Sequence, residues 1–161
     1  MNLIDWSPEL ELGEETMDAT HREFVELLNA VGAAPDEELL PRLDAFLAHT
    51  EAHFGDENRR MAEVNFPPSH CHTNEHENVL LIIRDVRGRV EGGDFEVGRV
   101  LATAVADWFR QHAATMDTML AWYLRTGGEV GGCSHGDACG HDHAAEPEHA
   151  EHGVATADAR G

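Results

Sequence analysis

Histidine and carboxylate side chains recur in this chain at spacings that place them on one face of a helix. His53 and Glu57 are four residues apart, which on a helix separates them by about 40° and one turn. His72 and His76 repeat this spacing with two imidazoles. Either pair alone also occurs by chance on exposed helices. Together they predict that two helices direct paired ligands toward a metal site.

Two further segments extend this pattern. His21 precedes both pairs, and His112 follows them, five residues before Asp117. Five residues correspond to about 140° on a regular helix, so His112 and Asp117 would not share a face. Either the helix contains a π-type turn between them, or Asp117 reaches the site from the flank as a bridge. The sequence leaves both alternatives open.

These segments together supply five imidazoles and two carboxylates. Burying so many imidazoles without partners would be costly, which argues against a chance arrangement. The donors are too many for one tetrahedral zinc but suit two iron ions bridged by both carboxylates and a solvent-derived oxygen. A nitrogen-rich set also favours a reversible cycle with dioxygen over high-valent oxidation of a substrate. The predicted ligands are His21, His53, Glu57, His72, His76, His112 and Asp117.

The elements that must position these ligands are four helices. Apolar residues recur at helical spacing over residues 18–31, 37–64, 70–91 and 95–125. Thr16 and Asp18 are candidate N-caps of the first helix, and Gly32 is its expected end. Short connections favour antiparallel neighbours. We therefore expect an all-α protein, an up-down antiparallel four-helix bundle with an N-terminal arm, whose core includes Ile82 and Val100.

The composition changes after Gly128. Residues 129–161 contain no Leu, Ile, Phe, Met, Trp or Tyr, and such a segment cannot form a core. We expect residues 1–128 to form the domain and residues 129–161 a flexible, acidic, His- and Cys-rich tail. The tail is either a solubilising segment or a labile metal-binding one. Its candidate ligands are Cys133, His135, Cys139, His141 and His143.

The charge of the chain excludes some classes of partner. The formal net charge is -20, which opposes nucleic acids and anionic membrane surfaces. No window approaches the roughly 18 to 20 apolar residues of a membrane span, and the N-terminus does not resemble a signal peptide. Three cysteines suggest reduced thiols and no disulfide framework. We expect a cytoplasmic monomer.

Over residues 3–126 the chain resembles the bacterial hemerythrins. Trp6 and the run from Met17 to His21 resemble that family's N-terminal arm and first ligand. His53-Phe54 followed by Glu57 and Met61 resembles its second-helix signature. The remaining candidate ligands complete its set of seven: His72, His76, His112 and Asp117.

The resemblance implies a role for each ligand. His72, His76 and His112 would hold one iron, and His21 and His53 the other. The carboxylates of Glu57 and Asp117 would bridge the two ions. The second iron would keep an open position for dioxygen, in an apolar pocket lined by Phe24, Trp108 and Phe109.

Three positions depart from the family's pattern. Ala113 stands where a bulky aliphatic residue is usual, which predicts a larger oxygen pocket and faster autoxidation. Asn58 replaces an acidic residue after Glu57, which predicts altered hydrogen bonding around the ligands. His49 lies one turn before His53 on the same face. It could hydrogen-bond a ligand or serve as a solvated or capping residue.

The resemblance favours an oxygen-binding protein that turns over no substrate. Its role would be storage, delivery or sensing of oxygen, the last through a separate oxygen-consuming or signalling protein. One alternative is a di-iron enzyme acting on peroxide, nitric oxide or another small substrate. A second is an iron-handling protein whose tail exchanges metal.

Overall fold

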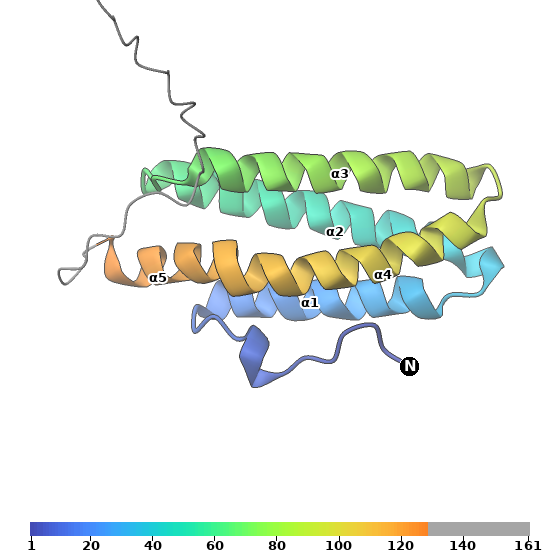
Figure 1. The fold of residues 1–161 in the computed structure, drawn as a ribbon, viewed down its shortest axis with the longest axis horizontal. Helices are drawn as coiled ribbons and strands as arrows, with labels where there is room; N and C mark the ends of the chain where they lie inside the picture. The colour runs from blue at the N-terminus through green and yellow to red at the C-terminus, as the bar shows by residue number, and fades with distance from the viewer. Residues whose placement is uncertain (129–161) are drawn as a thin grey trace, which may run out of the picture.

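The computed structural model describes residues 1–128, and all its regular elements there are helical. Four long helices form the bundle, the fourth continuing through a π-helical turn (Figure 1). Each packs against its two neighbours, so that α1 contacts α2 and α4, and α3 contacts α2 and α4. This confirms the predicted all-α, up-down four-helix bundle. The elements are η1 (Pro8–Leu10), α1 (Glu15–Ala33), α2 (Asp36–Glu63), α3 (Ser69–Glu91), α4 (Phe95–His112), η2 (Ala113–Asp117) and α5 (Thr118–Thr126).

The first bundle helix begins earlier than predicted. Glu14 is its N-cap, and its carboxylate accepts a hydrogen bond from the Met17 N–H at 2.8 Å. The prediction that Thr16 and Asp18 cap this helix was therefore wrong. Asp18 instead accepts hydrogen bonds from the backbone N–H groups of Leu12 and Gly13, at 2.7 and 3.1 Å. Its carboxylate ties the N-terminal arm to α1, close to His21.

The arm runs along α1 (Figure 1) and is held by hydrogen bonds. Asn29 accepts from the N–H groups of Leu3 and Ile4 and donates to the Ile4 carbonyl. The predicted helix end at Gly32 was one residue early, because α1 continues to Ala33. A Cβ at Gly32 would lie 2.6 Å from Leu3 Cδ1. This glycine therefore makes room for the arm.

The helix that carries His112 widens where the sequence left two alternatives open. Residues Ala113–Asp117 form a π-helix, which is the first of those alternatives. The hydroxyl of Thr118 donates to the Ala113 carbonyl at 2.8 Å, and the hydroxyl of Thr115 donates to Gln111 at 2.8 Å. The extra residue in the turn brings Asp117 round to the side of His112.

Fewer apolar side chains are buried in the interior than the sequence pattern predicted. On α3 the buried apolar side chains are Val79, Ile83, Val86 and Val90. Ile82 and Val100 are 55% and 58% exposed, so the prediction that they belong to the core was wrong. Apolar character alone did not locate the face that each helix turns inward. Within the described residues, no helix is both long and apolar enough to cross a membrane.

Candidate metal centre

The seven predicted ligands converge inside the bundle, and all are buried. Their ligand atoms form two groups that share Glu57. The three-imidazole group contains His72, His76 and His112, with Asp117 and Glu57. The two-imidazole group contains His21 and His53 with Glu57. Every long helix of the bundle contributes at least one of these side chains.

The three-imidazole group has the shape of one face of a metal coordination sphere. The Nε2 atom of His112 lies 3.2 Å from that of His76 and 3.0 Å from that of His72. Two bonds of about 2.1 Å that meet at a right angle place their ligand atoms about 3.0 Å apart. The three nitrogens are thus spaced as they would be around one ion.

Each carboxylate directs one oxygen toward each group. Glu57 Oε1 lies 2.9 Å from His53 Nε2, while Oε2 lies 3.3 Å from His76 Nε2. Asp117 Oδ1 lies 3.1 Å from the Nε2 atoms of both His72 and His112. Its Oδ2 lies 3.4 Å from His21 Nε2. The two carboxylates therefore span the space between the groups, as bridging ligands do.

The hydrogen bonding of this cluster fits metal binding better than a purely polar network. Nine buried side-chain nitrogen or oxygen atoms of the described residues have no hydrogen-bond partner, and eight belong to the predicted ligands. Buried polar groups normally have partners. Asp117 and His21 lie close to other polar atoms, but in directions unsuited to hydrogen bonds. Four of the eight atoms belong to the side of the ligands that faces the cluster, namely His21 Nε2, Glu57 Oε2 and both Asp117 oxygens, which fits the chemistry of a two-metal site.

Burial and the close approach of imidazoles and carboxylates also shift the pKa values of the candidate ligands. Burial lowers the pKa of His72, but Asp117 and Glu57 outweigh this effect and raise the pKa to about 9. Burial lowers the pKa of His76 to about 4. Burial raises the pKa of Glu57, but His53 and the other imidazoles bring that pKa well below its ordinary value. Protons and metal ions thus compete for the same lone pairs.

Side chains outside the ligand set hold the three-imidazole group in place. Asn58 Oδ1 accepts a hydrogen bond from His76 Nδ1 at 3.0 Å, which directs the Nε2 atom of that ring toward the site. The ring of Phe54 stacks on His76, with centroids 3.9 Å apart. The sequence anticipated altered hydrogen bonding at Asn58. Phe54 was named there only as part of the second-helix signature, and its stacking on His76 was not foreseen.

The fourth-helix ligand has its own supports. Trp108 stacks on His112 with ring centroids 4.5 Å apart, and its indole N–H donates to Glu75 at 3.0 Å. Glu75 Oε2 also lies 3.9 Å from His112 Nδ1. Trp108 therefore lies on the three-imidazole side of the centre. The sequence analysis did not single out Glu75, whose one signal is its position next to His76.

The two-imidazole group has apolar neighbours instead. Phe24 and Phe109 stack with centroids 4.6 Å apart. The edge of Phe109 meets His21 at 5.1 Å, and Phe24 meets His53 at 5.8 Å. Ala113 is buried in the large core cluster that also contains both phenylalanines. The ring contacts place Phe24 and Phe109, two of the four predicted pocket residues, on this side of the centre.

His49 forms no hydrogen bond with a predicted ligand within the described part of the chain, so the first of the two roles left open for it is not seen. Its Nε2–H donates to the Thr20 carbonyl at 3.3 Å, which links α2 to α1 next to His21. Burial and the neighbouring His53 lower the pKa of His49. The predicted tail ligands, Cys133, His135, Cys139, His141 and His143, lie outside the described residues.

Comparisons with known proteins agree with this arrangement. The family model described as Hemerythrin HHE cation binding domain matches residues 12–123. A bacteriohemerythrin of Ralstonia nicotianae is 48% identical over 77% of this chain and 90% of its own length. One of Stenotrophomonas maltophilia is 26% identical over 70% of this chain and 75% of its own.

Solved structures share the fold. A crystal structure of wild-type hemerythrin matches with a TM-score of 0.70 at 21% identity, covering 76% of this chain and 98% of its own. A hemerythrin variant gives a TM-score of 0.71 at 22% identity, over 77% and 98%. The family match spans every ligand that the bundle brings together, and a relative nearly half identical shares most of the length. The chain belongs to the hemerythrin family.

Proposed function

We propose that the chain binds dioxygen reversibly at a non-haem di-iron centre. His72, His76 and His112 would hold one iron, His21 and His53 would hold the other, and the carboxylates of Glu57 and Asp117 would be shared between them. The observation that carries this proposal is the division into groups with three and two imidazoles. One fewer imidazole leaves a coordination position for a small ligand. Ferrous ions bound there would supply the electrons that dioxygen accepts and returns.

The protein's own side chains set the conditions for reversibility. Glu57 and Asp117 hold both metal positions through opposite oxygens. Phe24 and Phe109 are buried beside the two-imidazole group and would exclude water from the dioxygen position. A dry, apolar wall disfavours the escape of charged oxygen species.

Anaerobic reconstitution tests this function. The metal-free protein is loaded with Fe(II), exposed to oxygen and deoxygenated, while the charge-transfer absorbance of the oxygenated form is followed over several cycles. We expect two irons and one dioxygen per chain, with the absorbance restored in each cycle. Irreversible oxidation at first exposure would contradict reversible binding and favour the di-iron enzyme acting on peroxide or nitric oxide.

The iron-handling alternative concerns residues 129–161. We infer that residues 1–128 form the oxygen-binding domain by themselves, since all seven ligands lie within them. Truncation after Gly128 should then leave the iron content and the optical bands unchanged. If the truncated protein lost weakly held metal but kept its two irons, the lost metal would be assigned to residues 129–161. A monomeric, cytoplasmic protein with a separate oxygen-consuming or signalling partner remains a prediction from sequence.

A further inference from the structure

A surface pocket of about 220 Å³ lies between α1 and α2, next to the two-imidazole group. Its lining includes Glu23 and His49 at the rim and His53. None of the other six candidate ligands lines it. The pocket therefore gives solvent access to a single ligand of the metal centre.

Two rim side chains present lone pairs to each other. Because a carbonyl can only accept, the His49 Nε2 that contacts the Thr20 carbonyl carries the hydrogen. In the neutral ring, Nδ1 then carries a lone pair. It faces Glu23 Oε2 at 3.6 Å, which is too long for a hydrogen bond. Two metal–ligand bonds of about 2.1 Å meeting at about 120° span this same distance.

The inner wall of the pocket reaches the metal centre through His53. This residue lines the pocket although it is only 4% exposed. Its Nε2 lies 2.9 Å from Glu57 Oε1, within the centre. One imidazole thus joins the pocket to the shared carboxylate. Asp56 adds a further carboxylate to the lining, although this carboxylate forms an ion pair with Arg59.

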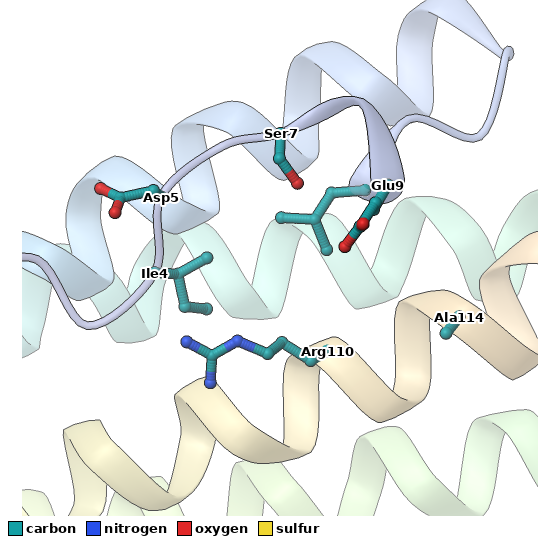
Figure 2. Close-up of a pocket in the computed structure, with 7 residues that line it drawn as sticks. Ile4, Asp5, Ser7, Glu9, Arg110 and Ala114 are labelled. Atoms are coloured by element: carbon teal, nitrogen blue, oxygen red, sulfur yellow. The ribbon is translucent and has the colours of Figure 1, made fainter.

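A second pocket of about 200 Å³ provides a contrast. It lies between the N-terminal arm and α4, and none of the seven candidate ligands lines it. Figure 2 shows Arg110 of α4 extending toward Ile4 of the arm. Arg110 donates to the Leu3 carbonyl at 2.6 Å. Its positive charge offsets part of the negative charge of Asp5 and Glu9, which also line this pocket, and no histidine lines it.

We propose that the pocket between α1 and α2 is the site where Fe(II) docks during assembly of the metal centre. Glu23 and His49 capture the hydrated ion at the rim, and His53 transfers it to Glu57 inside the bundle. The iron stays ferrous throughout, and its bound waters are exchanged for side-chain ligands. This inference rests on the proposed di-iron site and concerns how that site is filled.

The test is the rate of iron loading. Metal-free full-length protein is mixed anaerobically with ferrous ammonium sulfate, and a strong Fe(II) chelator removes loosely held metal at set times before the retained iron is counted. We expect Glu23→Gln and His49→Gln to slow loading by roughly tenfold, since rim charge and ligands raise local cation concentration. Both should still reach two irons per chain. Glu9→Gln, at the other pocket, is the matched control.

Two results would overturn the inference. One is loading of Glu23→Gln and His49→Gln at the unsubstituted rate. The other is equal slowing by Glu9→Gln, which would indicate a general effect of surface charge. Glu23 is exposed, so its variant remains informative even if His49→Gln is unstable. If the unsubstituted protein never retains two irons, the proposed function fails instead.

Discussion

The two ligand groups of the metal centre differ in what lies behind their imidazoles. His76 is held by a hydrogen bond to Asn58 and a stacked phenyl ring, and His112 by a stacked indole. Among the described residues, His76 is the one ligand imidazole whose Nδ1 has a hydrogen-bond acceptor, because the Nδ1 atoms of His21, His53, His72 and His112 have no partner. Their aromatic neighbours include phenyl rings meeting them at steep angles.

This asymmetry has a chemical consequence. Outer hydrogen bonds fix the orientation of metal ligands and increase their basicity. His76 is therefore the most firmly oriented of the five imidazoles. The two-imidazole group has no such acceptor and has phenyl rings beside its imidazoles instead. That half is the one suited to receiving iron and dioxygen.

Removing the shared carboxylate should have the largest effect, because it belongs to both halves. We expect Glu57→Ala to reduce the iron content after anaerobic loading from two per chain to less than one. Iron analysis of the desalted protein measures this. Glu63→Ala, an exposed carboxylate on the same helix, is the control and should retain two irons. Full iron retention by Glu57→Ala would show that the halves are independent.

Truncating an aromatic ring on each side should separate stability from oxygen chemistry. Phe109→Ala and Phe54→Ala both remove buried rings, and each should lower the free energy of unfolding by about 3–5 kcal/mol. Urea denaturation measures this loss. Phe109→Ala should also accelerate oxidation of the oxygenated protein more than Phe54→Ala does, because it opens the wall beside His21, whereas Phe54 stacks on His76 and meets His53 at 5.2 Å. Equal acceleration by both variants would remove the distinction between the halves.

Among the side chains that contact the outer nitrogens of the three-imidazole group, those at shorter distances should contribute more to iron affinity. Asn58→Ala removes the acceptor at 3.0 Å from His76, and we expect iron affinity to fall about 10- to 100-fold. Glu75→Ala should cost less, since that carboxylate lies 3.9 Å from His112 Nδ1. Competition with a chelator of known affinity measures the iron affinity of both variants. A larger effect at Glu75 would contradict this ranking.

The smallest expected effect is on the free energy of unfolding and concerns Glu14, the N-cap of the helix that carries His21. Burial raises the pKa of Glu14, but hydrogen bonds from Arg60 and the Met17 N–H outweigh it and lower that pKa. Glu14→Gln should cost about 1 kcal/mol of unfolding free energy at neutral pH. Because the folded-state pKa is depressed, this contribution is present above the unfolded pKa of about 4.3 and disappears as pH falls through the folded pKa.

Thermal unfolding at several pH values measures the difference between Glu14→Gln and the unsubstituted protein. The difference in stability between the two proteins should disappear at acidic pH. Glu11→Gln, whose partner Arg22 is half exposed, provides the control and should change stability little at any pH. A gap that widens in acid would reverse the assigned sign.

Local spacing explains why much of the centre was predictable. Pairs such as His53 and Glu57 lie on one helix face whatever surrounds them, so the ligands could be named from the sequence. The N-caps could not, because Asp18 is recruited by backbone groups of the arm. The inward faces were also misjudged at Ile82 and Val100, since packing partners, not hydrophobicity, select the buried face.

The amino-acid sequence by itself determined the four helices, the types of ligand and the resemblance to a family, because periodicity and spacing are local properties of a chain. Only the tertiary structure decided between the π-helix and a flanking Asp117. It also brought together the groups of three and two imidazoles that the family resemblance had implied, and it placed one oxygen of each carboxylate toward each group. These features depend on contacts between distant helices, which no local pattern encodes.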